Sequence, residues 1–258
     1  MRPALPAAFL RAPIAHRALH DAADQRPENS RAAVRAALSA GYGVELDLQL
    51  SADGQAVVFH DTTLDRMTGE PGLVRDRSRA ELAAIPLAGG AGEGIPSLAE
   101  VLALVAGQVP LLLELKDQDG SMGPGGVGAL EAAVADALRG YEGPVALMSF
   151  NPHAVAEMAR VAPEVPRGLV TSSYEPQDWP DLPKAVCDDL RGIHDFERVD
   201  AGFISHQADD LARRRVQQLR DQGVPVLCWT VKSLAEDTAA RAFADNVTFE
   251  GYLPPAAP

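Results

Sequence analysis

The alternation of aliphatic runs with amphipathic segments limits the fold of this chain more than any other feature of its sequence. Short runs rich in Val, Leu and Ile read as strands, and most pairs are separated by a helix or a long connection. Strands are expected at residues 10–15, 43–51, 56–59, 110–116, 145–149, 168–171, 202–205, 226–230 and 247–249. Helices are expected at residues 31–40, 79–84, 97–106, 129–138, 152–162, 183–191, 209–222 and 234–242. About eight such units predict an α/β fold whose parallel sheet closes as a TIM (β/α)8 barrel.

The length alone allows two small domains or one large one. The chain has 258 residues, a common length for this fold, and 47% of them are hydrophobic. We find no internal repeat and no linker that would divide it, so we expect a single domain over residues 1–258. Residues 62–95 are polar and rich in glycine, and we interpret them as a small insertion after the second strand.

A strand with two different faces begins at Gly43. Glu45 and Asp47 share one face, while the alternate positions are aliphatic and suited to packing on helices. Two carboxylates about 6 to 7 Å apart on one face repel each other, and a bound divalent cation commonly offsets that repulsion. The pattern also fits a solvated or salt-bridged pair without a metal. A turn and an apolar run then place His60 beside Asp61, a pairing suited to proton transfer.

Other charged residues also stand where expected strands end. His16 and Arg17 follow the first strand, while Glu114 and Lys116 share one face at the end of another. His60 lies just past a strand end. Because active sites of such barrels form at the carboxyl ends of the strands, we expect these side chains to gather with the acidic pair.

The charge and the hydropathy pattern exclude several classes of protein. A formal net charge of −13 argues against binding nucleic acid, which requires a basic surface. A small phosphate ester remains compatible if a metal and a few cations reverse the local field. No apolar run is long enough for a signal peptide or a membrane span, so we expect a cytoplasmic protein without stable membrane insertion.

Nine short motifs in order resemble those of the glycerophosphodiester phosphodiesterase family. They are His16-Arg17, Pro27-Glu28-Asn29-Ser30, Val44-Glu45-Leu46-Asp47, Asp53-Gly54, Val57-Val58-Phe59-His60-Asp61, Leu64-Asp65-Arg66-Met67-Thr68, Gly72-Leu73-Val74, Ile95-Pro96-Ser97-Leu98 and Leu113-Glu114-Leu115-Lys116. Each motif alone is weak, but their shared order and spacing are specific. Such enzymes have a barrel with a small insertion after the second strand, which agrees with the interpretation of residues 62–95.

The resemblance also implies roles for individual residues. It implies three carboxylate ligands for one divalent cation, Mg²⁺ or Ca²⁺: Glu45, Asp47 and Glu114. It implies a general base and a general acid: His16 and His60. It implies phosphate contacts from two cations: Arg17 and Lys116. Trp229, at a strand end, is a candidate for substrate binding, with packing in the barrel core as the alternative.

The implied reaction is metal-dependent hydrolysis of a small-molecule glycerophosphodiester to sn-glycerol 3-phosphate and an alcohol. Two alternatives are a barrel of the same fold that acts on lysophospholipids and a barrel that only binds phosphodiesters. The absence of a membrane-facing amphipathic helix or aromatic cluster argues against the first, and the intact histidine pair argues against the second. The sequence leaves open the head group, the metal, a cyclic phosphate intermediate and the oligomeric state, including a homo-oligomer.

Three positions depart from the family pattern. Ala18 stands where glycine usually follows His-Arg, and alanine would cost about 1 kcal/mol or more if the position needs a positive φ. Lys232 stands where the family usually has asparagine after Trp-Thr-Val. The last strand ends in Phe249-Glu250 rather than Thr-Asp. These departures bear on substrate preference more than on activity.

Overall fold

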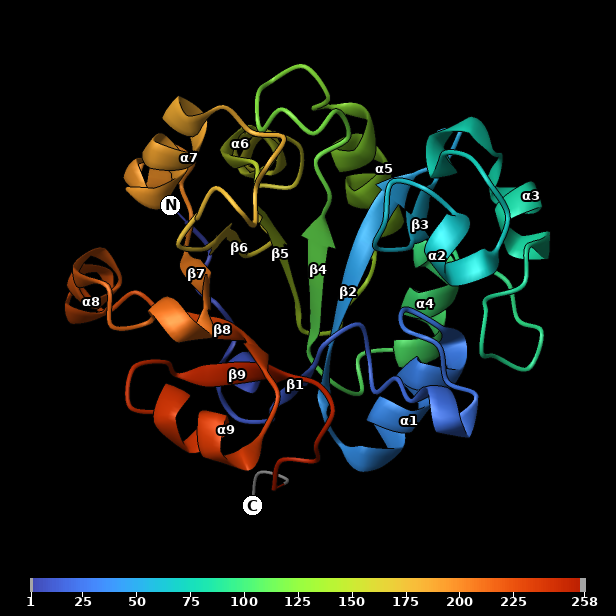
Figure 1. The fold of residues 1–258 in the computed structure, drawn as a ribbon, viewed down its shortest axis with the longest axis horizontal. Helices are drawn as coiled ribbons and strands as arrows, with labels where there is room; N and C mark the ends of the chain where they lie inside the picture. The colour runs from blue at the N-terminus through green and yellow to red at the C-terminus, as the bar shows by residue number, and fades with distance from the viewer. Residues whose placement is uncertain (1, 256–258) are drawn as a thin grey trace.

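Eight parallel strands close into a barrel in the computed structural model, which describes residues 2–255 (Figure 1). The strands follow the order β1-β9-β8-β7-β6-β5-β4-β2, and β1 pairs with β2 to close the ring. Their bounds are Ile14–Ala15 (β1), Gly43–Leu50 (β2), Leu111–Leu115 (β4), Val145–Ser149 (β5), Arg167–Thr171 (β6), Phe203–Gln207 (β7), Val226–Val231 (β8) and Asn246–Phe249 (β9). The predicted TIM barrel is confirmed.

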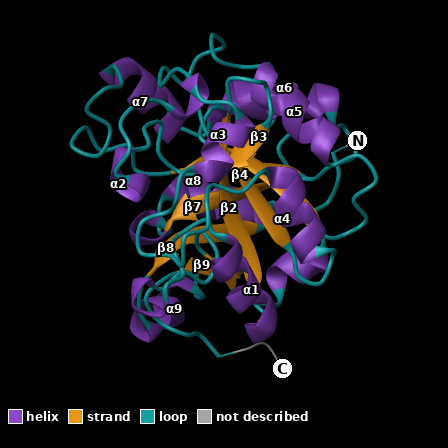
Figure 2. Ribbon diagram, turned by 90° about the vertical axis from the view of Figure 1, so that its right-hand side faces the viewer, coloured by secondary structure: helices purple, strands orange, loops and turns teal. Residues whose placement is uncertain are grey.

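Helices surround the barrel on its outer side (Figure 2). Their bounds are Arg31–Ala40 (α1), Asp65–Thr68 (α2), Arg79–Ala84 (α3), Leu98–Val105 (α4), Ala129–Ala137 (α5), Pro152–Val161 (α6), Lys184–Arg191 (α7), Arg214–Asp221 (α8) and Leu234–Ala240 (α9). Local capping fixes several starts; at α4, Ser97 and Glu100 form a reciprocal capping box. Across residues 2–255, no helix has both the length and the apolar character needed to cross a membrane.

The two faces of β2 separate the core from the site. Val44, Leu46 and Leu48 are fully buried in a core cluster that includes residues of α1 and α4. Glu45 and Asp47 lie on the opposite face, toward the barrel interior, as the alternating pattern predicts. The aliphatic face therefore anchors the strand, and the acidic face remains available for chemistry.

The insertion packs around a small core of its own. The strand β3, Ala56–Val58, runs antiparallel to β2 and begins this region. Residues 62–95 then carry α2 and α3, and only α3 was predicted from the sequence. Apolar side chains of β3 and of the segment that follows it form one cluster: Val57, Phe59, Leu64, Val74, Leu82, Leu87 and Ile95.

Two predicted elements differ from the structure. The first strand was expected from residue 10 but begins at Ile14, because Pro13 has no N–H to donate to a ladder. The helix expected at 209–222 begins only at Arg214. Arg213 has an extended backbone, and its N–H donates to the carbonyl of Asp210 in a turn before the helix.

Candidate active site

Three buried carboxylates meet on adjacent strands. The register of the parallel pair β2–β4 sets Asp47 directly beside Glu114, and Glu45 lies two residues earlier on β2. Each residue offers an oxygen within 4.8 Å of the others, and the three are 1–6% exposed. Burial, together with the negative charges of Asp47 and Glu114, raises the pKa of Glu45 well above its ordinary value.

Two cations lie against this cluster. The Nζ of Lys116 is 2.7 Å from Asp47 Oδ1 and 2.6 Å from Glu114 Oε1. Burial would raise the pKa of Asp47, but Lys116, His60 and Arg17 together hold it below its ordinary value. The Nε of Arg17 is 3.5 Å from Asp47 Oδ2. Both predicted phosphate-binding residues therefore lie beside the carboxylates.

The donor set fits a hard divalent cation. Three carboxylates face two cationic side chains, and Arg17 also pairs with Glu28 at 2.9 Å, so negative charge remains uncompensated. Oxygen ligands of this kind suit Mg²⁺ and Ca²⁺. Asn29 orients one of them, because its Nδ2 donates to Asp47 Oδ2 at 2.8 Å. The backbone N–H of Arg17 orients another by donating to Glu45 Oε2 at 2.9 Å.

His16 follows β1 and is held by a carboxylate from the other end of the chain. Its Nδ1 lies 2.7 Å from Glu250 Oε2, just beyond β9. Lys232 Nζ lies 3.0 Å from the other oxygen of Glu250. Burial lowers the pKa of His16, while the hydrogen bond with Glu250 opposes that shift. A neutral imidazole that donates from Nδ1 leaves Nε2 free to accept a proton.

His60 follows β3 and has a separate carboxylate partner. Its Nδ1 lies 2.6 Å from Asp61 Oδ1, and Arg66 Nε donates to Asp61 Oδ2 at 2.6 Å. Burial would raise the pKa of Asp61, but the hydrogen bonds from His60 and Arg66 lower it. Each histidine is therefore oriented through Nδ1 by its own ionised carboxylate.

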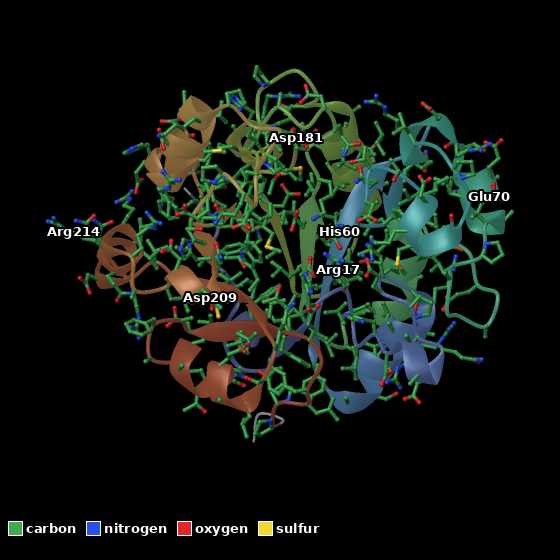
Figure 3. The ribbon with its side chains drawn as sticks, viewed as in Figure 1. Arg17, His60, Glu70, Asp181, Asp209 and Arg214 are labelled. Carbon is green, nitrogen blue, oxygen red and sulfur yellow. The ribbon has the colours of Figure 1, made fainter. Side chains whose placement is uncertain are left out.

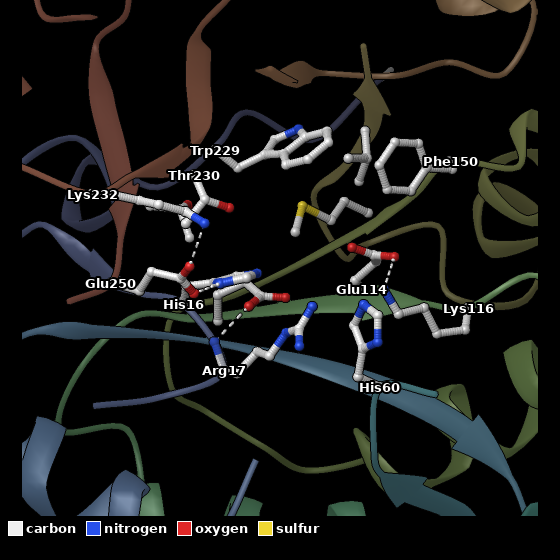
Figure 4. Close-up of a pocket in the computed structure, with 14 residues that line it drawn as sticks. His16, Arg17, His60, Glu114, Lys116, Phe150, Trp229, Thr230, Lys232 and Glu250 are labelled. Atoms are coloured by element: carbon white, nitrogen blue, oxygen red, sulfur yellow. Dashed lines mark hydrogen bonds and ion pairs between the residues drawn. The ribbon is translucent and has the colours of Figure 1, made fainter. Parts of the chain in front are cut away.

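A cavity of about 260 Å³, here called the inner chamber, joins these groups (Figure 4). Its walls include seven of the eight residues predicted from the sequence: His16, Arg17, Glu45, His60, Glu114, Lys116 and Trp229. Asp47, the eighth, is buried and contributes through the carboxylate cluster. In Figure 4 the side chain of Arg17 lies between those of His16 and His60. One cavity thus collects the predicted ligands, histidines and phosphate contacts.

A second cavity, here called the outer chamber, opens beside the first and measures about 550 Å³. The two share five lining residues: His60, Glu114, Lys116, Phe150 and Trp229. Its remaining walls come from Gln49 of β2 and from loops after β3, β4 and β6. Figure 3 shows Arg17 and His60 near the middle of the view, whereas Glu70 and Arg214 lie at opposite edges.

Several site features were missed from the sequence. Asn29 belongs to a matching motif, but its capping-type neighbours suggested only a helix start. Glu250 was noted as a departure without a role. The aromatic cluster was not predicted either: the ring centre of Phe150 lies 5.1 Å from that of Trp179 and 5.4 Å from that of Trp229.

The barrel and its site define an enzyme of phosphodiester chemistry, and the comparisons give its family. The chain belongs to the glycerophosphoryl diester phosphodiesterase family, whose sequence model matches residues 16–246. A glycerophosphodiester phosphodiesterase from Caldanaerobacter subterraneus is 30% identical over 215 residues, covering 80% of each chain.

Solved structures show the same architecture. A phosphodiesterase from Oleispira antarctica, in complex with the product sn-glycerol-3-phosphate, is 27% identical with a TM-score of 0.75, covering 94% of each chain. A glycerophosphoryl diester phosphodiesterase structure from Silicibacter pomeroyi has the same TM-score at 24% identity, covering 94% of this chain and 92% of its own. At that identity the second likeness supports the fold alone.

Proposed function

We propose that this enzyme uses Mg²⁺ or Ca²⁺ and two histidines to hydrolyse glycerophosphodiesters to sn-glycerol 3-phosphate and an alcohol. The observation that carries the proposal is the meeting of three carboxylates and two carboxylate-oriented imidazoles in one cavity. When bound to Glu45, Asp47 and Glu114, the cation supplies Lewis-acid stabilisation of phosphoryl oxygens. The product held by the Oleispira antarctica relative supports the same product here.

Arg17 and Lys116 hold the phosphate in this proposal. Both line the inner chamber, and both reach the carboxylate cluster from different segments. Arg17 presents a planar fork to two phosphate oxygens, and Lys116 presents a point charge. Negative charge develops on the phosphoryl group and the leaving oxygen in the transition state. Arg17 and Lys116 together stabilise that charge.

The chamber geometry supports different roles for the two histidines. His16 lines only the inner chamber, so its Nε2 is assigned to deprotonating the attacking hydroxyl, either water or the glycerol 2-hydroxyl. His60 lines both chambers, so it is assigned to protonating the alkoxide that leaves toward the outer chamber. Trp229 also lines both and is assigned to substrate contact at their junction.

We also propose that residues 1–258 act as one domain, because His16 and Glu250 approach to 2.7 Å from opposite ends of the sequence. A lysophospholipid is retained as a second candidate substrate. The aromatic side chains of the outer chamber offer apolar surface to an acyl chain, which supports keeping this candidate.

Release of glycerol 3-phosphate from glycerophosphocholine, followed by a coupled assay, tests the proposal. We expect turnover to stop after chelation and to return with Mg²⁺ or Ca²⁺, and Glu114→Gln to weaken cation binding measured by calorimetry. Glu142→Gln is the matched control, because Glu142 is exposed and lines neither chamber. Full turnover in chelator would remove the metal role. Turnover of lysophosphatidylcholine alone would instead favour the second candidate.

A further inference from the structure

The outer chamber is built from aromatic side chains that come from three separate segments. Phe150 follows β5, Trp179 lies in the loop before α7, and Trp229 lies on β8. The ring centre of Phe150 is 5.1 Å from that of Trp179 and 5.4 Å from that of Trp229. The indole N–H of Trp229 donates to the carbonyl of Ser205 at 3.1 Å, which fixes one ring. Figure 4 shows Trp229 and Phe150 on the same side of the inner chamber.

Carboxylates stand beside these rings without cationic partners. Asp178 and Asp181 line the outer chamber on the loop that carries Trp179, and both are exposed. Within the part of the chain that the structure describes, neither forms an ion pair with a lysine or arginine. The nearby cations Lys184 and Arg191 instead pair with Asp188.

Asp117 adds a third carboxylate to the same wall. It accepts hydrogen bonds from the Asn151 amide at 2.8 Å and from the backbone N–H of Met122 at 2.9 Å. Both donors are neutral, so they orient Asp117 without cancelling its charge. The wall that carries Asp117, Asp178 and Asp181 is therefore negative as well as aromatic, and it disfavours an anionic group.

The residues that line both chambers determine which part of a substrate would enter the outer chamber. His60 and Lys116 line both chambers, so a phosphate held between them directs one ester group inward and the other outward. A weakly hydrated cation gains from aromatic faces and from nearby carboxylates, whereas a neutral polyol gains from neither. We infer that the outer chamber binds a quaternary ammonium head group, so that diesters of a cationic amino alcohol of the choline type are the preferred substrates.

This inference rests on the proposed function and is tested with two diesters that differ only in charge. The first is glycerophosphocholine, and the second is its 3,3-dimethylbutyl isostere, in which carbon replaces the ammonium nitrogen. We expect kcat/KM to favour the choline diester by roughly three- to thirtyfold, the range expected for cation–π contacts. Equal kcat/KM for the two would overturn the inference.

Substitutions in the wall of the outer chamber test which residues cause the preference for the choline diester. Trp179→Leu and the double change Asp178→Asn with Asp181→Asn should each lower kcat/KM several fold more for the choline diester than for the isostere. Glu175→Gln is the control, because it lies on the same loop and is exposed but does not line the chamber. Equal losses on both diesters would contradict recognition of charge.

The same assay separates this inference from the function on which it rests. If neither diester is cleaved with Mg²⁺ or Ca²⁺, the proposed hydrolysis itself fails. If both are cleaved with equal kcat/KM, hydrolysis stands and only recognition of the cationic head group is lost. A glycerophosphoethanolamine arm adds a primary ammonium; a higher kcat/KM for it than for the choline diester would overturn the assignment to a quaternary ammonium.

Discussion

The inner and outer chambers are built on different principles. Strand residues supply the inner carboxylates, which are nearly fully buried and held by short contacts to Lys116 and Asn29. Loops supply much of the outer chamber, and its carboxylates Asp178 and Asp181 are exposed. In the proposed function this difference separates two tasks: strands position the metal ligands, and loops contact the group that is attached to the phosphate.

Removing either histidine should have the largest effect on turnover, and the change in structure should be limited to the inner chamber. His16→Ala and His60→Ala are each expected to lower kcat by about 10²- to 10⁴-fold, because each removes one proton transfer. Steady-state kinetics on glycerophosphocholine measure the loss, and circular dichroism checks that the barrel is retained. Near-normal kcat in either variant would contradict the acid–base assignment.

Loss of the amide that orients Asp47 should have the next largest effect. Asn29 has φ +58°, so Asn29→Gly removes the side chain while keeping a residue that tolerates this backbone. Groups that orient metal ligands typically contribute about 10- to 100-fold in affinity, and we expect a weakening of this size in Mg²⁺ titrations. Unchanged affinity would show that β2 alone fixes the ligand.

Replacing the carboxylate behind His16 should have a smaller effect with a distinctive pH dependence. Glu250 opposes the burial that lowers the pKa of His16, so Glu250→Gln should lower that pKa further. The acid limb of kcat/KM, where the base becomes protonated, should then move to lower pH, and the plateau should fall about tenfold. A lower plateau with an unmoved acid limb would indicate that Glu250 serves only structure.

The smallest expected effect concerns stability rather than chemistry. Ala18 has φ +64°, the left-handed conformation that glycine adopts most readily, so the strain anticipated from the sequence is present. Relief of that strain in Ala18→Gly exceeds the added entropy of the unfolded chain, and we expect a gain of about 0.5 kcal/mol. Urea denaturation measures it, and a loss of stability would show that packing of the buried methyl group outweighs the strain.

The sequence predicted the inner chamber well because its residues obey local rules. Glu45, Asp47 and Glu114 stand at fixed positions in strands, and parallel neighbours in a barrel bring such positions together. The start of β1 and the start of α8 were misplaced because Pro13 and a turn at Asp210 override the hydrophobic pattern.

The outer chamber could not be predicted in the same way. Phe150, Trp179 and Trp229 are dispersed over about 80 positions with no shared period, so only the folded barrel brings their rings together. Glu250 has the same difficulty, because its partner His16 is 234 residues away. Long-range pairs of this kind form only when the sheet closes, and a local sequence pattern does not predict which residues that closure brings together.

The contact between His16 and Glu250 makes the proposed base depend on the segment that is synthesised last. These residues follow β1 and β9, the first and last strands of the barrel, which pair in parallel. During synthesis on a ribosome, a growing polypeptide that lacks β9 already contains the carboxylates of β2 and β4 but not the carboxylate partner of His16. Until β9 pairs with β1, such an unfinished chain would lack the carboxylate that orients the proposed base.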